Sequence, residues 1–213
     1  MSDAPAAGGV AERARSLPLF PLRTVLFPGG LLPLKVFEHR YVEMTKACLR
    51  EERPFGVCLI LEGDEVARGD GGRPKIASVG TLARIANVDM PQLGILHVAT
   101  VGQGRFEVHR SAPDALGLLI GEVTPIPDEP RTPLPESQAR LAKLLALIAA
   151  KLGPENFPAE THYDDATWVG HRLAELLPLP LETKQRMLEV SNAGVRLAAL
   201  AQYLERQGLL QAL

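Results

Sequence analysis

Residues 17–41 read LPLFPLRTVLFPGGLLPLKVFEHRY, and their prolines, glycines and apolar residues constrain the fold more than any other part of this chain. Each of the four prolines pushes the residue before it out of the helical region, so residues 17–23 are predicted to be extended. Pro28, Gly29 and Gly30 predict a turn, which a short strand over residues 31–35 follows. Strands that contain proline lie at sheet edges or beside bulges, because proline cannot donate to the ladder.

Beyond this stretch, one helix interrupts a series of further strands. Phe37, Tyr41, Met44 and Cys48 recur at helical spacing, and Pro54 is expected to end that helix. Residues 105–109 alternate cleanly between apolar and polar, which predicts one buried face and one face in contact with water. Other strands are predicted over residues 55–61, 79–88, 93–101 and 118–123. Six or seven short strands with one inserted helix are typical of a small barrel or sandwich.

Proline spacing divides the chain near residue 124. Five prolines lie within residues 125–135. So many prolines prevent a continuous ladder of strand hydrogen bonds, so this segment is predicted to be a domain boundary or a stiff linker. We expect a disordered tail over residues 1–15, a barrel domain over residues 16–125 and a helical bundle subdomain over residues 126–213. Inside the barrel domain, the polar and glycine-rich residues 62–74 are expected to form an exposed, mobile loop.

Four amphipathic helices are predicted after the linker, because apolar residues recur at helical spacing throughout this part of the chain. The first carries its apolar stripe over residues 141–152. The expected boundaries are Gly153-Pro154 after the first helix, Asp164 or Asp165 as N-cap of the second, residues 181–190 for the third, and Asn192 as N-cap of the last. Short loops between such helices indicate a small bundle.

The composition is that of a soluble globular protein. Of the 213 residues, 46% are hydrophobic and 23% are charged, and the formal net charge is −2. Residues 1–125 contain 14 basic and 14 acidic residues and the remainder contains 9 and 11, so neither part has the positive excess of a nucleic-acid-binding or membrane-binding surface. No apolar run approaches the ~20 residues of a membrane span, and residues 1–16 lack the apolar core of a signal peptide. The sequence therefore predicts a cytoplasmic protein with free thiols.

The motifs of nucleotide binding and nucleophilic catalysis are missing from the sequence. No Gly-Lys dipeptide occurs, so there is no P-loop, and the glycines at 69–72 and 102–104 are interpreted as turn glycines. Cys48 and Cys58 lie in apolar stretches, where burial makes a thiol inert. No serine lies in a Gly-x-Ser-x-Gly elbow, and no base is evident for Ser16, Ser78, Ser111, Ser137 or Ser191.

The histidines and single aromatic residues also favour structural interpretations. The five histidines are His39, His97, His109, His162 and His171, and no two are four residues apart. His162 with Asp164 and Asp165 is the one cluster similar to a metal site, but capping of the following helix explains the aspartates more simply. His97 and His109 are expected on strand faces in contact with solvent, and Trp168 and Tyr203 in the core. We therefore assign no catalytic, cofactor-binding or metal-binding residue and expect no cofactor.

Residues 17–41 resemble the start of the N-terminal domain of Lon proteases, through LPLFPL, LFPG and LPL-x-VFE-x-RY in the family's order and spacing. Later blocks are similar too: Phe55-Gly-Val, Val79-Gly-Thr-Leu-Ala-Arg-Ile, Gly104-Arg-Phe-Glu-Val, Leu176-Leu-Pro, Lys184-Gln-x-x-Leu-Glu189 and Arg196-Leu. The resemblance covers about residues 17–204. His39 departs from it, since the family often has proline where this helix opens.

The resemblance implies an α+β fold, a PUA-like β-barrel with one inserted helix followed by a C-terminal α-helical bundle. It also implies recognition without proteolysis, because the ATPase and Ser-Lys peptidase modules of that family follow this region. The leading hypothesis is a stand-alone, non-catalytic module that binds exposed apolar or misfolded polypeptide in an apolar groove between barrel and bundle. The first alternative is a small-ligand-binding protein or an enzyme that reuses the barrel. The second is an RNA-binding PUA-like protein, against which the even charge balance argues.

Overall fold

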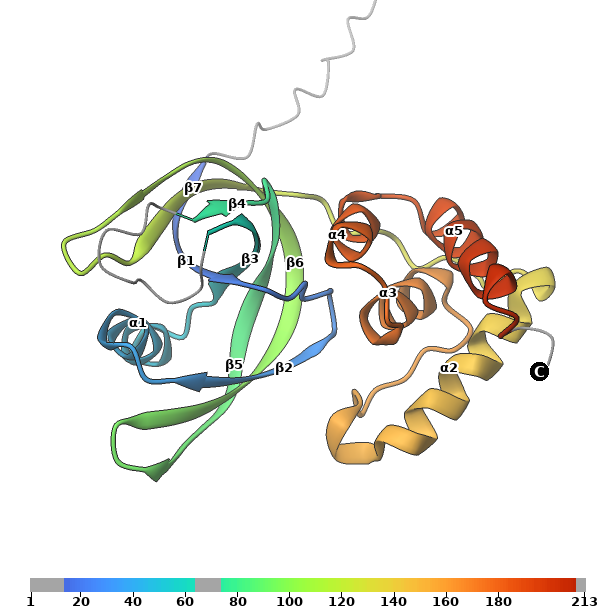
Figure 1. Ribbon diagram of the computed structural model, residues 1–213, viewed down its shortest axis with the longest axis horizontal. Helices are drawn as coiled ribbons and strands as arrows, with labels where there is room; N and C mark the ends of the chain where they lie inside the picture. The colour runs from blue at the N-terminus through green and yellow to red at the C-terminus, as the bar shows by residue number, and fades with distance from the viewer. Residues whose placement is uncertain (1–13, 64–73, 210–213) are drawn as a thin grey trace, which may run out of the picture.

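The structure, a computed structural model, describes residues 14–63 and 74–209, and within them a seven-stranded sheet curls into a ring (Figure 1). The strands are β1 (Arg15–Leu22), β2 (Leu31–Val36), β3 (Phe55–Glu62), β4 (Lys75–Ile76), β5 (Val79–Gln92), β6 (Ile95–Pro113) and β7 (Leu119–Pro125). β1 pairs antiparallel with β7 and parallel with β3, so the order β1-β7-β6-β5-β3 returns to β1. β2 adds to β6, and β4 adds to β3. This ring confirms the predicted barrel.

Helix α1 (His39–Arg50) is inserted between β2 and β3 and covers one side of the ring (Figure 1). Tyr41, Met44 and Cys48 are buried as predicted, and the Tyr41 ring stacks on Phe20 with centroids 3.9 Å apart. The prediction was wrong for Phe37, which is 57% exposed. The helix begins after Phe37, because Glu38 takes an extended N-cap conformation that interrupts the helical spacing.

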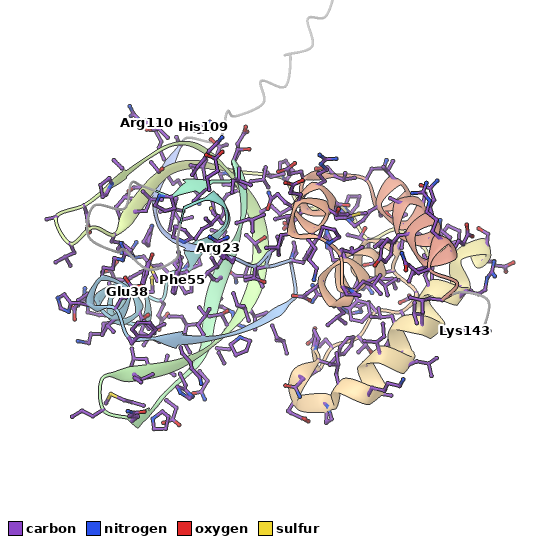
Figure 2. The ribbon with its side chains drawn as sticks, in the orientation of Figure 1. Arg23, Glu38, Phe55, His109, Arg110 and Lys143 are labelled. Atoms are coloured by element: carbon purple, nitrogen blue, oxygen red, sulfur yellow. The ribbon has the colours of Figure 1, made fainter. Side chains whose placement is uncertain are left out.

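The interior of the ring is filled by apolar side chains from several strands. Figure 2 shows Phe55 inside the barrel, whereas His109 and Arg110 lie at its outer edge. Phe55, Val57, Ala83 and Val98 each expose 2% of their surface or less. Alternation along the strands therefore places one face of each strand in this core.

Strand β6 is continuous from Ile95 to Pro113, so the prediction of a turn at Gly102–Gly104 is wrong. Glycine is needed at residue 102 because the backbone of β6 comes close there to the backbone of residues 27–30. Its N–H donates to the carbonyl of Gly30 and its own carbonyl accepts from Gly29, both at 2.8 Å. A Cβ at Gly102 would lie 2.2 Å from the carbonyl oxygen of Phe27. A glycine inside a strand can thus mark contact with another segment rather than a turn.

Arg105 in β6 contradicts the prediction that one face of residues 105–109 contacts water. It lies on the face expected to contact water, yet it is 3% exposed. The helices cover this face of the strand, and the guanidinium reaches the end of α4 (Leu181–Glu189). Alternation predicted the orientation of the side chain correctly but not what packs against it.

The second part of the chain is helical, as predicted. It contains α2 (Ala139–Leu152), α3 (Ala166–Leu176), α4 (Leu181–Glu189) and α5 (Ala193–Arg206), with short turns η1 (Glu136–Gln138) and η2 (Pro154–Asn156). Asp165 caps α3 by accepting from the Thr167 N–H, and Asn192 caps α5 by accepting from the Val195 N–H. Gly153, with φ of 81°, ends α2. None of the helices described is long and apolar enough to cross a membrane.

The helices pack on one another and on the barrel through a shared apolar core. Leu145, Leu173, Leu197 and Leu200 are fully buried, and the same cluster includes Phe27 from the barrel. The sheet and the helices therefore bury a common interface (Figure 1). The observed α+β architecture, a ring of strands with an inserted helix followed by helices, confirms the predicted fold class.

The segment between β7 and α2 runs along the start of α3 instead of spanning open solvent. Pro133 forms an isolated bridge with Asp165, and the Ala166 N–H donates to the Thr132 carbonyl at 2.7 Å. The division into a barrel domain over 16–125 and a helical subdomain over 126–213 stays a prediction. Most of the predicted tail, most of the predicted loop over 62–74 and the glycines at 69–72 lie outside the described residues.

Candidate functional site

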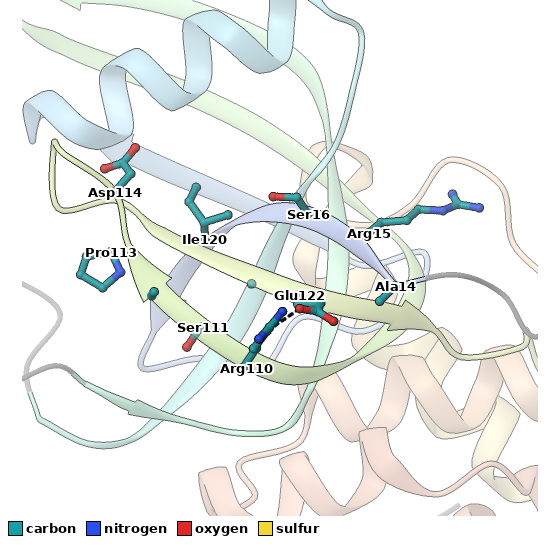
Figure 3. A pocket seen from close by; sticks show the side chains of 11 residues that line it. Ala14, Arg15, Ser16, Arg110, Ser111, Pro113, Asp114, Ile120 and Glu122 are labelled. Atoms are coloured by element: carbon teal, nitrogen blue, oxygen red, sulfur yellow. Dashed lines mark hydrogen bonds and ion pairs between the residues drawn. The ribbon is translucent and has the colours of Figure 1, made fainter.

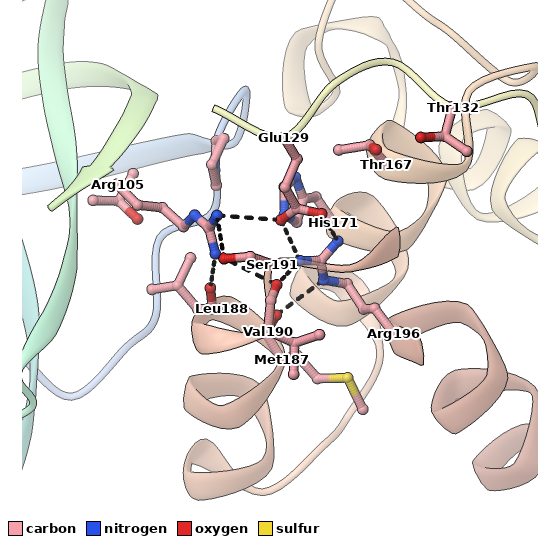
Figure 4. A network of polar contacts seen from close by, with 12 residues as sticks. Arg105, Glu129, Thr132, Thr167, His171, Met187, Leu188, Val190, Ser191 and Arg196 are labelled. Atoms are coloured by element: carbon pink, nitrogen blue, oxygen red, sulfur yellow. Dashed lines mark hydrogen bonds and ion pairs between the residues drawn. The ribbon is translucent and has the colours of Figure 1, made fainter. Parts of the chain in front are cut away.

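Buried charged side chains gather where the sheet meets the helices (Figure 4). Glu129, from the proline-rich segment before α2, lies at the centre, and its side chain is 5% exposed. Arg105 from β6, His171 from α3 and Arg196 from α5 surround it. One carboxylate therefore connects the barrel with two of the helices.

Arg196 makes the shortest contacts with Glu129. Its Nη1 donates to Oε2 at 3.0 Å and its Nη2 to Oε1 at 2.5 Å, the bidentate pairing that guanidinium and carboxylate favour. Nε donates to the Met187 carbonyl at 2.9 Å, and Nη2 also reaches the Val190 carbonyl. Arg196 is fully buried, so these hydrogen bonds replace the hydration that it lost on folding.

Arg105 connects strand β6 to the same cluster. Its Nη1 donates to the Leu188 carbonyl at 2.7 Å, and its Nη2 donates to Ser191 Oγ at 3.0 Å and lies 3.5 Å from Glu129 Oε1. Carbonyl groups at the C-terminal end of a helix lack partners within the helix and attract cations. Arg105 thereby fixes the end of α4 against the barrel.

Glu129 is ionised and His171 is neutral at neutral pH. Burial by itself would raise the pKa of Glu129, but its contacts with His171 and Arg196 outweigh burial and lower that pKa to about 2. Burial lowers the pKa of His171 to about 4, although Glu129 opposes this shift. His171 Nε2 lies 3.5 Å from Glu129 Oε1, at the long limit of hydrogen-bond distance. The cluster therefore contains one negative charge between two guanidinium groups.

Arg172 forms a second contact between helix and barrel, at the predicted turn of Pro28, Gly29 and Gly30. It is fully buried, and its Nη2 donates to the Pro28 carbonyl at 2.8 Å and lies 3.2 Å from Glu175 Oε2. A Cβ at Gly30 would lie 2.1 Å from Glu175 Oε1. The same Cβ would lie 2.9 Å from the backbone carbonyl oxygen of Phe27, so the turn needs glycine at this position.

A hollow of about 400 Å³ opens beside the cluster, between the sheet and the helices. Its lining mixes polar side chains, among them Asp128, Glu129 and Asp165, with the apolar Pro28 and Trp168, and an apolar binding groove between barrel and helices stays a prediction. Two of the carboxylates are already engaged, because Glu129 pairs with arginines and Asp165 caps α3. Among the described residues, no serine or cysteine forms a hydrogen bond with a histidine.

The histidines and aromatic residues that were considered for a site, none of which was assigned to one, are scattered over the molecule. His97 and His109 are exposed on β6 as predicted, and His39 is exposed at the start of α1. His162 lies with Nδ1 2.9 Å from Arg131 Nη2. No group of three or more His, Cys, Asp or Glu side chains within residues 14–63 and 74–209 is placed to hold a metal ion. Trp168 and Tyr203 pack against the helical core as predicted.

Both thiols are buried and free, which predicts low reactivity in the folded protein. Cys48 is 2% and Cys58 is 1% exposed, and burial raises the pKa of both, that of Cys58 to about 12. A thiol-reactive chromogenic disulfide at about pH 8 is therefore expected to label neither residue in the native state and both after denaturation. Rapid labelling of the native protein would contradict this prediction.

Exposed large apolar side chains gather at one end of the sheet, here termed the hairpin end. Met90 is 53% and Leu93 is 91% exposed at the tip of the β5–β6 hairpin, the green hairpin at the lower left of Figure 1. Val36 pairs with Leu96, so the strand register brings the exposed Phe37 to the same end. Exposed apolar patches mark interaction surfaces in soluble proteins.

Four residues of these buried clusters were not predicted from the sequence: Glu129, Arg105, Arg172 and Arg196. One signal was available for two of them: Arg172 and Arg196 lie on helical faces whose other members are apolar and buried, such as Val169 and Leu200. An arginine at such a position needs a buried partner. For Arg196 the sequence could not identify that partner, because Glu129 lies 67 residues away, whereas the carboxylate beside Arg172 is Glu175, three residues along the same helix.

Comparison with known sequences supports one relationship over nearly the whole chain. The family model for the "ATP-dependent protease La (LON) substrate-binding domain" matches residues 16–206. The chain is 31% identical over 201 residues to the Lon protease of Anaeromyxobacter dehalogenans (strain 2CP-C), covering 90% of this chain and 23% of that protein. Lon protease 2 of Myxococcus xanthus is 31% identical over 201 residues, with 90% and 24% covered. This chain thus spans about a quarter of the length of these curated relatives.

Solved structures agree with this relationship. The crystal structure of a Lon N-terminal domain protein from Xanthomonas campestris superposes with a TM-score of 0.72 at 36% identity, covering 89% of this chain and 98% of that one. The N-terminal domain of a Mycobacterium avium complex Lon protease superposes with a TM-score of 0.62 at 18% identity, over 90% of this chain and 98% of that one. At that identity the second likeness concerns the fold alone.

Proposed function

This chain belongs to the family of Lon substrate-binding domains, and from that membership we propose that it binds exposed apolar or misfolded polypeptide segments without cutting them. The observation that carries the proposal is the family match over residues 16–206. The family is described as a substrate-binding domain, and the region makes up about a quarter of the length of relatives named Lon protease, which favours recognition over chemistry. The two buried, free thiols are consistent with a cytoplasmic protein.

The hairpin end offers the apolar surface that such binding requires. Met90, Leu93 and Phe37 are each more than half exposed, and their burial against a client segment would stabilise a complex. Full burial of one large apolar side chain contributes about 1.5–3 kcal/mol. Unfolded polypeptide exposes apolar side chains that a folded protein buries, so this surface would bind unfolded polypeptide in preference to folded protein.

Replacing Met90 and Leu93 together by serine is expected to weaken binding of unfolded polypeptide about tenfold. The measurement is fluorescence anisotropy with a labelled, permanently unfolded protein, titrated with the intact chain. The matched control replaces Leu147 and Val195 by serine, since both are exposed apolar residues on helices.

The outcomes separate the alternatives. The proposal is supported if the hairpin variant weakens binding of unfolded polypeptide and the control variant leaves it unchanged. No binding of unfolded protein at tens of micromolar, with the far-ultraviolet circular dichroism intact, contradicts it. Salt-sensitive binding of structured RNA in place of polypeptide would favour the RNA-binding alternative.

A further inference from the structure

Helix α2 contains three basic residues and no acidic residue. Each of the other α-helices in the described part of the chain, α1, α3, α4 and α5, contains at least one glutamate. Arg140, Lys143 and Lys151 are all exposed, and they belong to a chain whose net charge is −2. Positive charge is therefore concentrated on α2 and is not a property of the whole surface.

The three cations lie along one face of the helix, which we call the basic face of α2. Its residues, Arg140, Lys143, Leu147 and Lys151, follow one another at intervals of three, four and four, the spacing of neighbours on one side of an α-helix. Leu147 is 52% exposed, so the face also presents one large apolar side chain. Figure 2 shows Lys143 at the end of the molecule that lies away from the barrel. The opposite face of α2, which includes Leu145, packs into the helical core.

The cations of the basic face have no partner within residues 14–63 and 74–209. None of the three takes part in an ion pair or a side-chain hydrogen bond there. Many other surface cations do have one: Arg110 contacts Glu122 beside a hollow on the barrel (Figure 3), and Lys46 lies 2.8 Å from Glu43. The charges of the basic face are therefore available to an external ligand.

The carboxylates nearest in sequence flank α2 without pairing with it. Glu136 lies in η1, four residues before Arg140, and Glu155 lies beyond the end of α2 and accepts from Asn156 Nδ2 at 3.0 Å. Arg140 is in the first turn of α2, where the helix dipole disfavours a cation, and Lys143, three residues on, repels it. Stability of the helix does not account for this arrangement, whereas a bound anionic partner would offset the repulsion.

The shape of the basic face suits another helix. Ala139, Ala146 and Ala150 are exposed beside it, and such small side chains let a second helix approach to an interaxial distance of about 8–10 Å. At about 1.5 Å per residue, Arg140 and Lys151 are roughly 16 Å apart along the axis, the length of three helical turns. A helix with carboxylates on both sides of an apolar stripe matches this pattern of charges around Leu147.

We infer that the basic face of α2 docks an acidic amphipathic helix of a partner protein. The partner's carboxylates pair with Arg140, Lys143 and Lys151, and its apolar side chains pack on Leu147. An anionic membrane is disfavoured because the apolar face of α2, which would have to enter the lipid, is buried in the core. Nucleic acid is disfavoured because α2 has no aromatic side chain for stacking and the chain as a whole is negatively charged.

The basic face and the hairpin end lie at opposite ends of the molecule (Figure 1). A client segment at Met90 and Leu93 leaves α2 uncovered, so the partner helix and the client can bind at the same time. The inference thus adds a second partner to the proposed function and does not depend on it.

The test compares two fluorescein-labelled helical peptides that have leucine at intervals of three and four residues. One peptide carries glutamate on both sides of the leucines, and the matched peptide carries lysine at the same positions. The glutamate peptide is expected to bind the intact chain at least about tenfold more tightly by anisotropy. Raising the salt from about 50 mM to about 500 mM is expected to reduce this preference, because exposed charges are screened.

Charge reversal then locates the binding. Lys143→Glu with Lys151→Glu keeps good helix formers on α2 and is expected to weaken binding of the glutamate peptide about tenfold or more. The matched control is Lys35→Glu with Arg84→Glu, two exposed cations on separate barrel strands that likewise have no partner in the described residues. It changes the net charge equally and is expected to leave the affinity unchanged within about twofold. Glutamine at the same four positions provides a second pair of variants in case charge reversal prevents folding.

Two further variants test the apolar contact and the place of binding. Leu147→Ser is expected to weaken binding of the glutamate peptide about threefold or more, and an unchanged affinity would contradict an amphipathic partner. Met90→Ser with Leu93→Ser is expected to leave the affinity unchanged. A loss of affinity in that variant would place the peptide at the hairpin end and overturn the inference.

The remaining outcomes separate this inference from the proposed function. Equal binding of both peptides, or an equal loss in the α2 and barrel variants, overturns the docking assignment even if unfolded protein still binds. Binding of phosphatidylserine vesicles or of single-stranded RNA that the α2 variant abolishes, without glutamate-peptide binding, also overturns it. Binding of the glutamate peptide to α2 without any binding of unfolded protein supports it and contradicts the proposed function alone.

Discussion

Glu129→Gln is expected to lower the free energy of unfolding by about 3–5 kcal/mol, the cost of removing one partner from a buried ion pair. Glutamine keeps the shape of the side chain but carries no charge, so the buried guanidinium groups of Arg105 and Arg196 lose the carboxylate between them. Urea unfolding followed by circular dichroism measures the change. The linear dependence of unfolding free energy on urea gives the comparison with wild type.

The matched control for this variant is the neighbouring carboxylate. Asp128 is exposed, and Asp128→Asn is expected to change the unfolding free energy by less than about 0.5 kcal/mol. If both variants lose the same stability, or if neither does, the central role of Glu129 in the junction is wrong. Hydrogen exchange adds a local readout, since the amides of α4 and α5 are expected to lose protection first in Glu129→Gln.

The pH dependence of stability provides an independent check on Glu129. Its pKa is about 2 in the folded protein and near 4.5 in an unfolded chain, so the stabilisation is complete above about pH 4.5 and is lost as the pH falls towards 2. His171 adds a second loss at higher pH, because its pKa falls from 6.5 to about 4 on folding and only the unfolded chain takes up the proton between these values. Glu129→Gln is expected to remove the loss that Glu129 causes below pH 4.5 and to retain the loss that His171 causes from pH 6.5 downward, which extends below pH 4 because Glu129 no longer raises the pKa of His171.

Gly102→Ala is expected to have the next largest effect, a loss of about 3 kcal/mol, at the upper end of the cost of overpacking. The new Cβ would lie 2.2 Å from the carbonyl oxygen of Phe27 and 3.1 Å from its carbonyl carbon. These are backbone atoms, which cannot rotate away, so β6 has to separate from the Phe27–Gly30 segment. The hydrogen bonds of Gly102 with Gly29 and Gly30 would then lengthen or break. Thermal and urea unfolding measure the loss.

Gly104→Ala is the matched control, since it makes the same substitution two residues further along β6. Its Cβ would meet only Asp128 Oδ1 at 3.2 Å, the end of an exposed side chain that can move. The unfolding free energy is expected to change by less than about 1 kcal/mol, with reduced unfolded-state entropy favouring alanine. Equal destabilisation by both substitutions would show that glycine is needed along β6 for flexibility and not for close approach at Gly102.

The candidate binding surfaces were harder to predict from the sequence than the fold was. Leu93 was predicted at the start of a strand and Met90 between two strands, and their exposure depends on a hairpin that extends beyond the barrel (Figure 1). A binding surface of this kind arises from the positions of several elements, so periodicity within one element cannot reveal it.

Local chemistry in the chain was sufficient to predict the types of element, their order and several of their boundaries. Asp165 and Asn192 cap helices and Gly153 ends one because capping depends on atoms within a few residues of each other. Only the tertiary structure revealed that Gly102 lies inside a strand, that Arg105 is buried on a face expected to be wet, and that Glu129 is the buried centre of the junction. Those properties depend on partners that lie up to 86 residues away in the chain for Arg105 and 67 for Arg196. A buried charge without a partner is costly, and these partners reach the charged groups only when the helices pack on the sheet.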